Sequence, residues 1–435
     1  MQDPQLPNEP EQPELSDQPG TCGLVRKSLL RQLFAGAYMM RWNDKLRPCP
    51  LAEIDKQAHK MIVTAVLWTR TCASRPRASH YPLAQELIEG ALFDYFFRLV
   101  VTDIKPPIFY RIQANKSHYD KLVHYVFGRL EAVLAPLGPF WDRFRTWHTQ
   151  KDSFEEARTI LSAAHQFASQ WEFQLIRPLN GFDRELPQIA ATFEENLRSL
   201  ATRVPGMDDI LADTALSRFV NFCGQLRFQI RWTQLARIPQ TDVLGHMFFV
   251  GALAYLYSLT LGTCQARRVN NFFCGLFHDL PELLTRDIIS PIKQSSSELA
   301  RLIRDYEEEE LDRRILSPLK EAGEDLLVSR LRYYLGLEVG SEFAQRFVLD
   351  GTVHTTAGFA ELHAAHDRDS EHPLDGQLVK ACDLLAAFLE ADESLRNGVA
   401  SGYLTQARLR LAGSLQDRTR FPSCLQLDSL LADFD

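Results

Sequence analysis

The sequence predicts an all-α protein made of two tandem helical domains that resemble each other. Apolar residues recur at three- and four-residue spacing over long segments, for example 83–101, 122–137, 298–311 and 377–395. This spacing places apolar side chains on one face of a helix, and prolines and glycines fall between the segments rather than inside them. Strand patterns are almost absent, and a motif of the first half returns in the second.

The chain has 435 residues and a formal net charge of −8, with 45% hydrophobic residues. That length allows two or three domains, each with its own core. The negative charge argues against a nucleic-acid polymer as partner, although a few local arginines can hold a small nucleotide. The eight cysteines form no CxxC pair, so we expect reduced thiols in a cytoplasmic protein.

Residues 247–264 carry no formal charge and begin directly after His246. These eighteen residues reach the length of a membrane span. The run also contains Tyr255, Tyr257 and two glycines, and a helix buried in a large helical core has the same hydropathy. We expect a core helix and no membrane partner; a membrane-anchored protein is the alternative.

The internal repeat aligns residues 91–108 with residues 275–292 at a constant offset of 184, without a gap. Upstream, Arg41-Trp42 is echoed by Arg231-Trp232. Each pair is followed by a polar segment with proline and then by a histidine at the head of an apolar helix, His59 in one half and His246 in the other. Three features in the same order indicate two copies of one helical domain.

The predicted organisation follows from this repeat. Residues 1–21 are rich in Pro, Gln, Glu and Asp and are expected to be a disordered tail. The first helical domain is expected at 22–185, a linker at 186–204, the second domain at 205–420 and a C-terminal tail at 421–435.

Metal-ligand chemistry is concentrated in the second copy. His278 and Asp279 are adjacent and supply one imidazole nitrogen and one carboxylate oxygen, a mixed set that suits a divalent ion such as Mn, Co, Mg, Fe or Zn. His246 heads the preceding helix, and Asp383 is a lone carboxylate in the apolar pattern LVKACDLLAAFL, where it needs a partner. Four such ligands leave open positions for water and substrate.

Each residue also has a structural interpretation. Asp279 to Glu282 read DLPE, which fits a helix N-cap with proline in the first turn and a glutamate three residues after the cap. His246 alone is more often a core histidine, and Asp383 alone could be a buried hydrogen-bond acceptor. Capping and metal binding by Asp279 do not exclude each other.

The order H…HD…D, followed by HDLPELLTRDIISPIK, resembles the HD-domain hydrolases and within them the 5′-deoxynucleotidase branch. That family joins its doublet to a nearby glutamate and a D-x-x-x-P-x-K segment, here Glu282 and residues 287–293. It also carries an Arg-Trp pair, matched by Arg231-Trp232, and LVKACD is similar to its segment with the last ligand. The resemblance covers residues 215–395.

The resemblance implies a hydrolase that cleaves nucleoside 5′-monophosphates, most of all deoxynucleotides, to nucleoside and phosphate with one divalent metal. It implies metal ligands His246, His278, Asp279 and Asp383; Glu282 to orient or deprotonate water; Arg231 to hold the phosphate; Trp232 to pack near the sugar; and Asp287 and Ser290 to contact the nucleoside. An HD triphosphohydrolase and a nucleotide-binding regulatory or scaffold protein without turnover are the alternatives. Related enzymes are often dimeric, so a homodimer stays open.

The first copy has lost the metal doublet. Asp94 and Tyr95 stand at its place, Arg98 stands at the place of Glu282, and the repeat puts Gln166 near the last ligand. Arg41, Trp42 and Asp103 are retained. They are either structural leftovers or part of a domain that binds a nucleotide without cleaving it.

Overall fold

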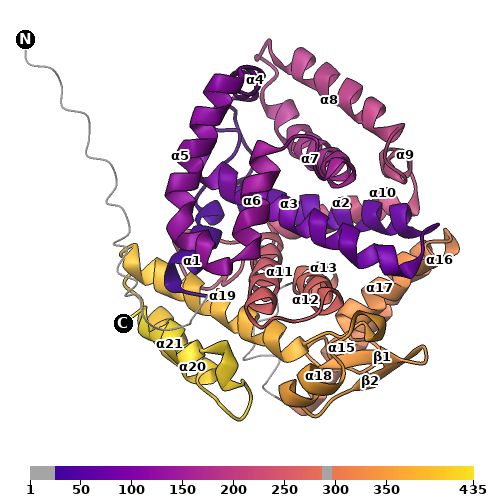
Figure 1. The fold of residues 1–435 in the computed structure, drawn as a ribbon, viewed down its shortest axis with the longest axis vertical. Coiled ribbons are helices and arrows are strands. Elements are labelled where there is room, and N and C mark those ends of the chain that lie inside the picture. The colour runs from indigo at the N-terminus through magenta and orange to yellow at the C-terminus, as the bar shows by residue number, and fades with distance from the viewer. Residues whose placement is uncertain (1–24, 287–295) are drawn as a thin grey trace, which may run out of the picture.

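The structure, a computed structural model, describes residues 25–286 and 296–435, and its helices confirm the all-α fold class. Figure 1 shows the first half of the chain above and the second half below, with helix α11 between them. The first half contains α1 (Lys27–Phe34), α2 (Glu53–Cys72), α3 (His80–Val101), α4 (Pro106–Ala114), α5 (Lys116–Leu134), α6 (Pro139–Thr149), α7 (Glu155–Ile176) and α8 (Leu186–Ala201). The second half contains α9 (Met207–Leu211), α10 (Ala215–Cys223), α11 (Val243–Thr260), α12 (Gln265–Phe277), α13 (Glu282–Thr285), α15 (Ser297–Leu311), α16 (Ser317–Glu321), α17 (Asp325–Leu335), α18 (Phe359–Ala365), α19 (Gly376–Arg396), α20 (Gly402–Leu415) and α21 (Leu427–Ala432).

One β-hairpin interrupts the helices of the second half, after α17. Strand β1 (Arg346–Leu349) pairs antiparallel with β2 (Thr352–Thr355). Asp350 and Gly351 form the turn, both with positive φ of 51° and 77°, which is the Asp-Gly geometry of a two-residue hairpin. Strands of four residues are too short for their alternation to stand out from a helical pattern.

Helix α11 is the centre of the fold and packs against α2, α12 and α19. It meets the length and hydropathy of a membrane span, but 89% of its window is buried inside the protein, which favours a core helix. Its contact with α12 is closest at Gly251, where an added Cβ would lie 2.7 Å from the carbonyl oxygen of Phe272. Two glycines, Gly251 and Gly275, therefore let these two backbones touch.

The two halves share one continuous apolar core in the described part of the chain. At their junction Trp68 of α2 stacks on Phe273 of α12, with ring centroids 5.2 Å apart. The interval 186–204, expected as a linker, contains helix α8, and residues 421–435, expected as a tail, contain α21. Arg26 Nε donates to Asp433 of that last segment at 2.8 Å. Both segments bury apolar side chains, which an extended linker or tail would leave in water.

Candidate metal centre

Three helices of the second half bring the predicted ligands together. His246 is the fourth residue of α11, His278 is the residue at which α12 ends, and Asp383 lies in the second turn of α19. One donor atom from each of these three lies within 4.8 Å of the other two. Asp279 follows in the turn after α12, and its Oδ2 is 3.6 Å from His246 Nε2 and 3.2 Å from His278 Nε2.

Hydrogen bonds fix the imidazole rings. His278 Nδ1 lies 2.8 Å from the carbonyl oxygen of Gly275, so it donates there and Nε2 is left with its lone pair facing the carboxylates. That buried Nε2 has no hydrogen bond to any residue in the described ranges. His246 Nε2 is 3.1 Å from Asp383 Oδ1, and its Nδ1 is 3.9 Å from Glu390. Burial would lower the pKa of His278, but Asp279 and Asp383 raise it above the ordinary value, so a bound metal would take the place of its proton. Imidazoles that converge with carboxylates are a donor set for a divalent metal ion.

Charges within the cluster keep its carboxylates ionised. Burial alone would raise the pKa of Asp279, but His278, His246 and Arg231 lower it below the ordinary range. Burial would likewise raise the pKa of Asp383, and Lys380 and His246 lower it well below that range. Burial, followed by the charge of Arg231, lowers the pKa of His246. Deprotonated carboxylates and a deprotonated imidazole are the forms that bind metal.

The N-cap expected at Asp279 is wrong. Helix α13 begins at Glu282, its N-cap residue is Pro281, and no side-chain cap bond is formed there. Asp279 instead closes a turn through its carbonyl oxygen, which accepts from Glu282 N at 3.0 Å. The carboxylate of Asp279 faces the histidines, where capping would not place it.

The Arg-Trp pair reaches the cluster from a separate loop. Arg231 is 13% exposed, and one of its Nη atoms is 3.6 Å from Asp279 Oδ2. Its Nε is 3.3 Å from Glu390, and Trp232 Nε1 donates to the same carboxylate at 2.8 Å. Trp232 has a φ of 58°, so the chain turns sharply between the two side chains.

Glu282 is 6% exposed and lies close to Arg231. Burial would lower the pKa of Arg231, but the carboxylates of Glu390, Asp279, Asp383 and Glu282 raise it above the ordinary value. Two further predicted residues, Asp287 and Ser290, lie outside the described residues. The structure thus places seven of the nine predicted side chains, and all seven belong to this one cluster.

Two charged residues of the cluster, both on α19, were not predicted from the sequence. Glu390 is buried and accepts from Trp232 and from Thr241 Oγ1, the latter at 2.8 Å. Lys380 Nζ donates to Asp383 Oδ2 at 2.7 Å. Helical spacing could have identified both residues. Lys380 lies three residues before Asp383 and Glu390 lies seven residues after it, so all three share one face of the helix.

The first half repeats this framework with other side chains. Helices α2 and α11 both begin directly after the Arg-Trp loop, and their fourth residues are Lys56 and His246. Glu172 of α7 accepts from Trp42 Nε1 at 2.9 Å, as Glu390 accepts from Trp232. His165 lies seven residues before Glu172, as Asp383 lies seven residues before Glu390.

The counterparts named from the sequence alone were therefore wrong. Lys56, not His59, corresponds to His246, and His165, not Gln166, corresponds to Asp383. His59 lies one turn further along and its Nε2 is 3.0 Å from the carbonyl oxygen of Val220, a core contact. The matching loops and helix starts support the interpretation of the halves as two copies.

Comparison with known proteins agrees with the location of the cluster. Residues 223–411 match the family model of the HD domain, so the matched region includes every residue of the metal centre. A 5′-deoxynucleotidase of Vibrio parahaemolyticus is 25% identical over 207 residues, which cover 46% of this chain and 86% of that protein. A 4′-phosphooxetanocin A phosphatase of Priestia megaterium is 29% identical over 84 residues, 19% of this chain and 43% of that protein.

Proposed function

We propose that this protein is a metal-dependent phosphohydrolase that cleaves deoxynucleoside 5′-monophosphates to nucleoside and phosphate. The observation that carries the proposal is the meeting of Arg231 with the His246, His278, Asp279 and Asp383 donors in one buried cluster. The names of the two relatives, a 5′-deoxynucleotidase and a phosphatase, support phosphate-ester hydrolysis as the reaction.

The donors fit a divalent metal ion. The lone pair of His278 Nε2 is buried without a hydrogen bond among the described residues, and the carboxylates beside it stay ionised. Formal charge agrees, because the carboxylates outnumber the cations, with three cations among four carboxylates: Arg231, Arg237, Lys380, Asp279, Glu282, Asp383 and Glu390. When bound, the metal supplies positive charge that acidifies water and polarises the phosphoryl oxygens.

The side chains then divide the remaining work. Arg231 presents a planar fork of donors to the phosphate oxygens, and Glu390 holds that fork in place at 3.3 Å. Glu282 accepts a proton from the attacking water while the water oxygen bonds to phosphorus. As the bond from phosphorus to the nucleoside oxygen breaks, that proton passes to the nucleoside oxygen, which leaves as a hydroxyl group. Trp232, fixed through its indole N–H, packs near the sugar, while Asp287 and Ser290 are assigned to the nucleoside.

The test is a phosphate-release screen with ribo- and deoxynucleoside mono- and triphosphates, in the presence of Mn or Co and after chelation. We expect release from deoxynucleoside monophosphates with metal only. Asp279→Asn should reduce it to the level of the chelated enzyme, and Arg231→Met should raise KM because phosphate contacts are lost.

Asp213→Asn is the matched control, since Asp213 is exposed and pairs only with Arg218 among the described residues. It should leave release unchanged. No release from any nucleotide, or full activity in Asp279→Asn, would overturn the proposal. Binding of nucleotides without release would favour a regulatory protein, and release from triphosphates alone would favour a triphosphohydrolase.

A further inference from the structure

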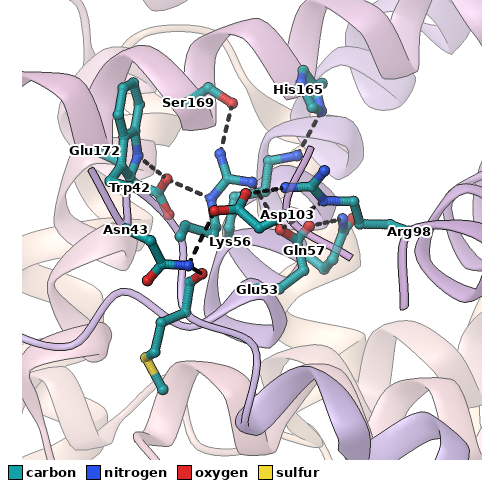
Figure 2. A network of polar contacts seen from close by, with 12 residues as sticks. Trp42, Asn43, Glu53, Lys56, Gln57, Arg98, Asp103, His165, Ser169 and Glu172 are labelled. Carbon is teal, nitrogen blue, oxygen red and sulfur yellow. Dashed lines mark hydrogen bonds and ion pairs between the residues drawn. The ribbon is translucent and has the colours of Figure 1, made fainter. Parts of the chain in front are cut away.

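The first half contains a polar cluster at the place that corresponds to the metal centre, and Figure 2 shows it from close by. Arg41 lies where Arg231 lies in the second half. Its Nε is 2.7 Å from Glu172 and one Nη is 2.8 Å from Glu53. Arg98 donates to Asp103 at 2.7 Å, and Asn43 reaches the same carboxylate at 3.0 Å.

An ammonium group replaces the histidine of the metal centre in this cluster. Lys56 Nζ lies 2.5 Å from His165 Nδ1, whereas the corresponding pair His246 and Asp383 is an imidazole and a carboxylate. Tyr95 stands at the position of another metal ligand and turns into the core, where its hydroxyl donates to the carbonyl oxygen of Leu33 at 2.7 Å. A metal would thus find no equivalent donor set here.

The first-half cluster is rich in basic side chains without a metal. Four of them lie among three carboxylates: Arg41, Lys56, Arg98, Arg227, Glu53, Asp103 and Glu172. In the second half the carboxylates outnumber the basic side chains around the metal ligands. The first cluster therefore holds more positive charge at rest than the second.

Lys56 is the member of the cluster whose charge is least compensated. Its side chain is fully buried, and within the described ranges no carboxylate oxygen lies within 4.0 Å of its Nζ. Burial holds the pKa of Lys56 well below the usual value, although the charge of Glu53 raises it in part. A buried ammonium group that faces a neutral ring is costly unless an anion joins it.

The cluster is open to solvent on one side. Asn43 and His165 are exposed, Asp103 is 36% exposed and Arg98 is 26% exposed, while Lys56 lies beneath them. Binding of an anion at Lys56 requires these exposed side chains to move aside, and the Arg98–Asp103 pair is the contact that it would replace.

We propose that this cluster binds a phosphate monoester dianion without a metal, between Lys56, Arg98 and Arg41. Charge-assisted hydrogen bonds from an ammonium and two guanidinium groups are the donors that phosphate oxygens prefer. All five corresponding ligand and water-handling positions differ here, and three of them, Lys56, Tyr95 and Arg98, replace a metal ligand or the glutamate that hydrolysis requires, so the ligand would be held and not cleaved. This inference does not depend on turnover in the second half.

The test is isothermal titration of the full-length protein in EDTA, with inorganic phosphate and with deoxyadenosine 5′-monophosphate as separate probes. Wild type should bind, and Lys56→Met, which keeps the length of the side chain, should weaken binding by about 10- to 100-fold because one charged hydrogen bond is lost. Arg198→Met is the matched control, because Arg198 is 73% exposed and pairs with Glu194 away from the cluster. It should change the Kd by less than about threefold, a shift smaller than one hydrogen bond.

Absence of binding in EDTA would overturn the inference, as would binding that Arg198→Met abolishes or that Lys56→Met leaves unchanged. If Lys56→Met does not fold, Arg98→Gln on the open side serves the same test with the same expected direction. Tighter binding of the deoxynucleotide than of phosphate would identify a nucleotide as the source of the anion, and the reverse would identify free phosphate. Because the titration contains no metal, its failure is separate from a failure of phosphate release.

Discussion

Replacing Glu390 by glutamine tests how the second half holds its buried charges. The Glu390 side chain is 2% exposed and contacts Arg231, Trp232 and Thr241. Burial would raise its pKa, but Arg231, Arg237 and His246 lower the pKa to about 2 from the ordinary 4.5. A carboxyl group with a lowered pKa stabilises the folded state above its unfolded pKa and loses that effect as the pH falls toward its folded pKa.

The lowering from 4.5 to about 2 corresponds to about 3 kcal/mol of folding free energy at pH 7. Removing one partner of a buried ion pair costs about 3–5 kcal/mol, so both routes give the same magnitude. Glu390→Gln keeps an acceptor for Trp232 and removes only the charge. We therefore expect a loss of about 3 kcal/mol at pH 7 that shrinks to about 2 kcal/mol at pH 3.5.

Urea unfolding of the metal-free protein, followed by circular dichroism at both pH values, measures this difference. Glu194→Gln is the control, because Glu194 and its partner Arg198 are 70% and 73% exposed and such pairs contribute little. A loss below about 1 kcal/mol at pH 7 would refute the assignment of Glu390 as the counter-charge of Arg231, since it would match an exposed pair. An equal loss at both pH values would refute ionisation as its cause.

Three shorter predictions follow. Burial and the charge of Asp55 raise the pKa of Asp242 to about 9, so the folded state holds a proton that the unfolded carboxylate releases. Stability therefore falls as pH rises from about 4 to 9. Asp55→Asn should flatten the dependence of Tm on pH between pH 6 and 9, and an unchanged slope would contradict this prediction. Gly251→Ala should lower the free energy of unfolding, measured in urea, by at least about 1–3 kcal/mol, because its Cβ would clash with the main chain at Phe272. An unchanged free energy of unfolding would show that α11 and α12 can move apart freely. Manganese at a hundredfold excess over its Kd should stabilise the wild-type protein by about 2.7 kcal/mol in thermal melts and leave the Tm of Asp383→Asn unchanged. Equal shifts of Tm in the two proteins would place the metal elsewhere.

The long helices could be predicted from the periodic spacing of their apolar residues. The spacing in residues 377–395 predicts helix α19, which spans Gly376–Arg396. The segment 421–435 was misjudged as a tail because short runs such as Leu427–Ala432 gain their stability from packing against the rest of the protein. The hairpin at residues 346–355 was missed although Asp350-Gly351 is a turn signal, because the flanking strands are only four residues long.

The candidate site could be predicted where its residues have chemical signatures. A His-Asp doublet after an apolar helix is visible in a sequence, and His278 and Asp279 do meet His246 and Asp383. Glu390 has no such signature, since a glutamate on a helix is usually exposed and its burial depends on Trp232, which lies 158 residues away.

Register explains the misplaced counterparts in the first half. The offset of 184 holds for residues 91–108 and 275–292, but the Arg-Trp loops are 190 apart and the two glutamates, Glu172 and Glu390, are 218 apart. Loops of different length between corresponding helices cost little free energy and shift the numbering. An alignment anchored on one motif therefore names neighbours of the true counterparts, and only helix starts and shared hydrogen bonds correct it.

Retention of Arg41, Trp42 and Glu172 does not by itself indicate a ligand in the first half. Glu172 also binds Arg227 at 2.7 Å, with both side chains fully buried, so this framework is an internal ion network that would be costly to break even in a domain without a site. Lys56 is different, because methionine could fill its place without burying a charge. Lys56 is fully buried beside His165, and among the described residues no carboxylate oxygen lies within 4.0 Å of its Nζ, so a bound anion would supply the direct counter-charge that it lacks. The structural interpretation therefore accounts for the arginine and tryptophan, and the ligand interpretation rests on the lysine.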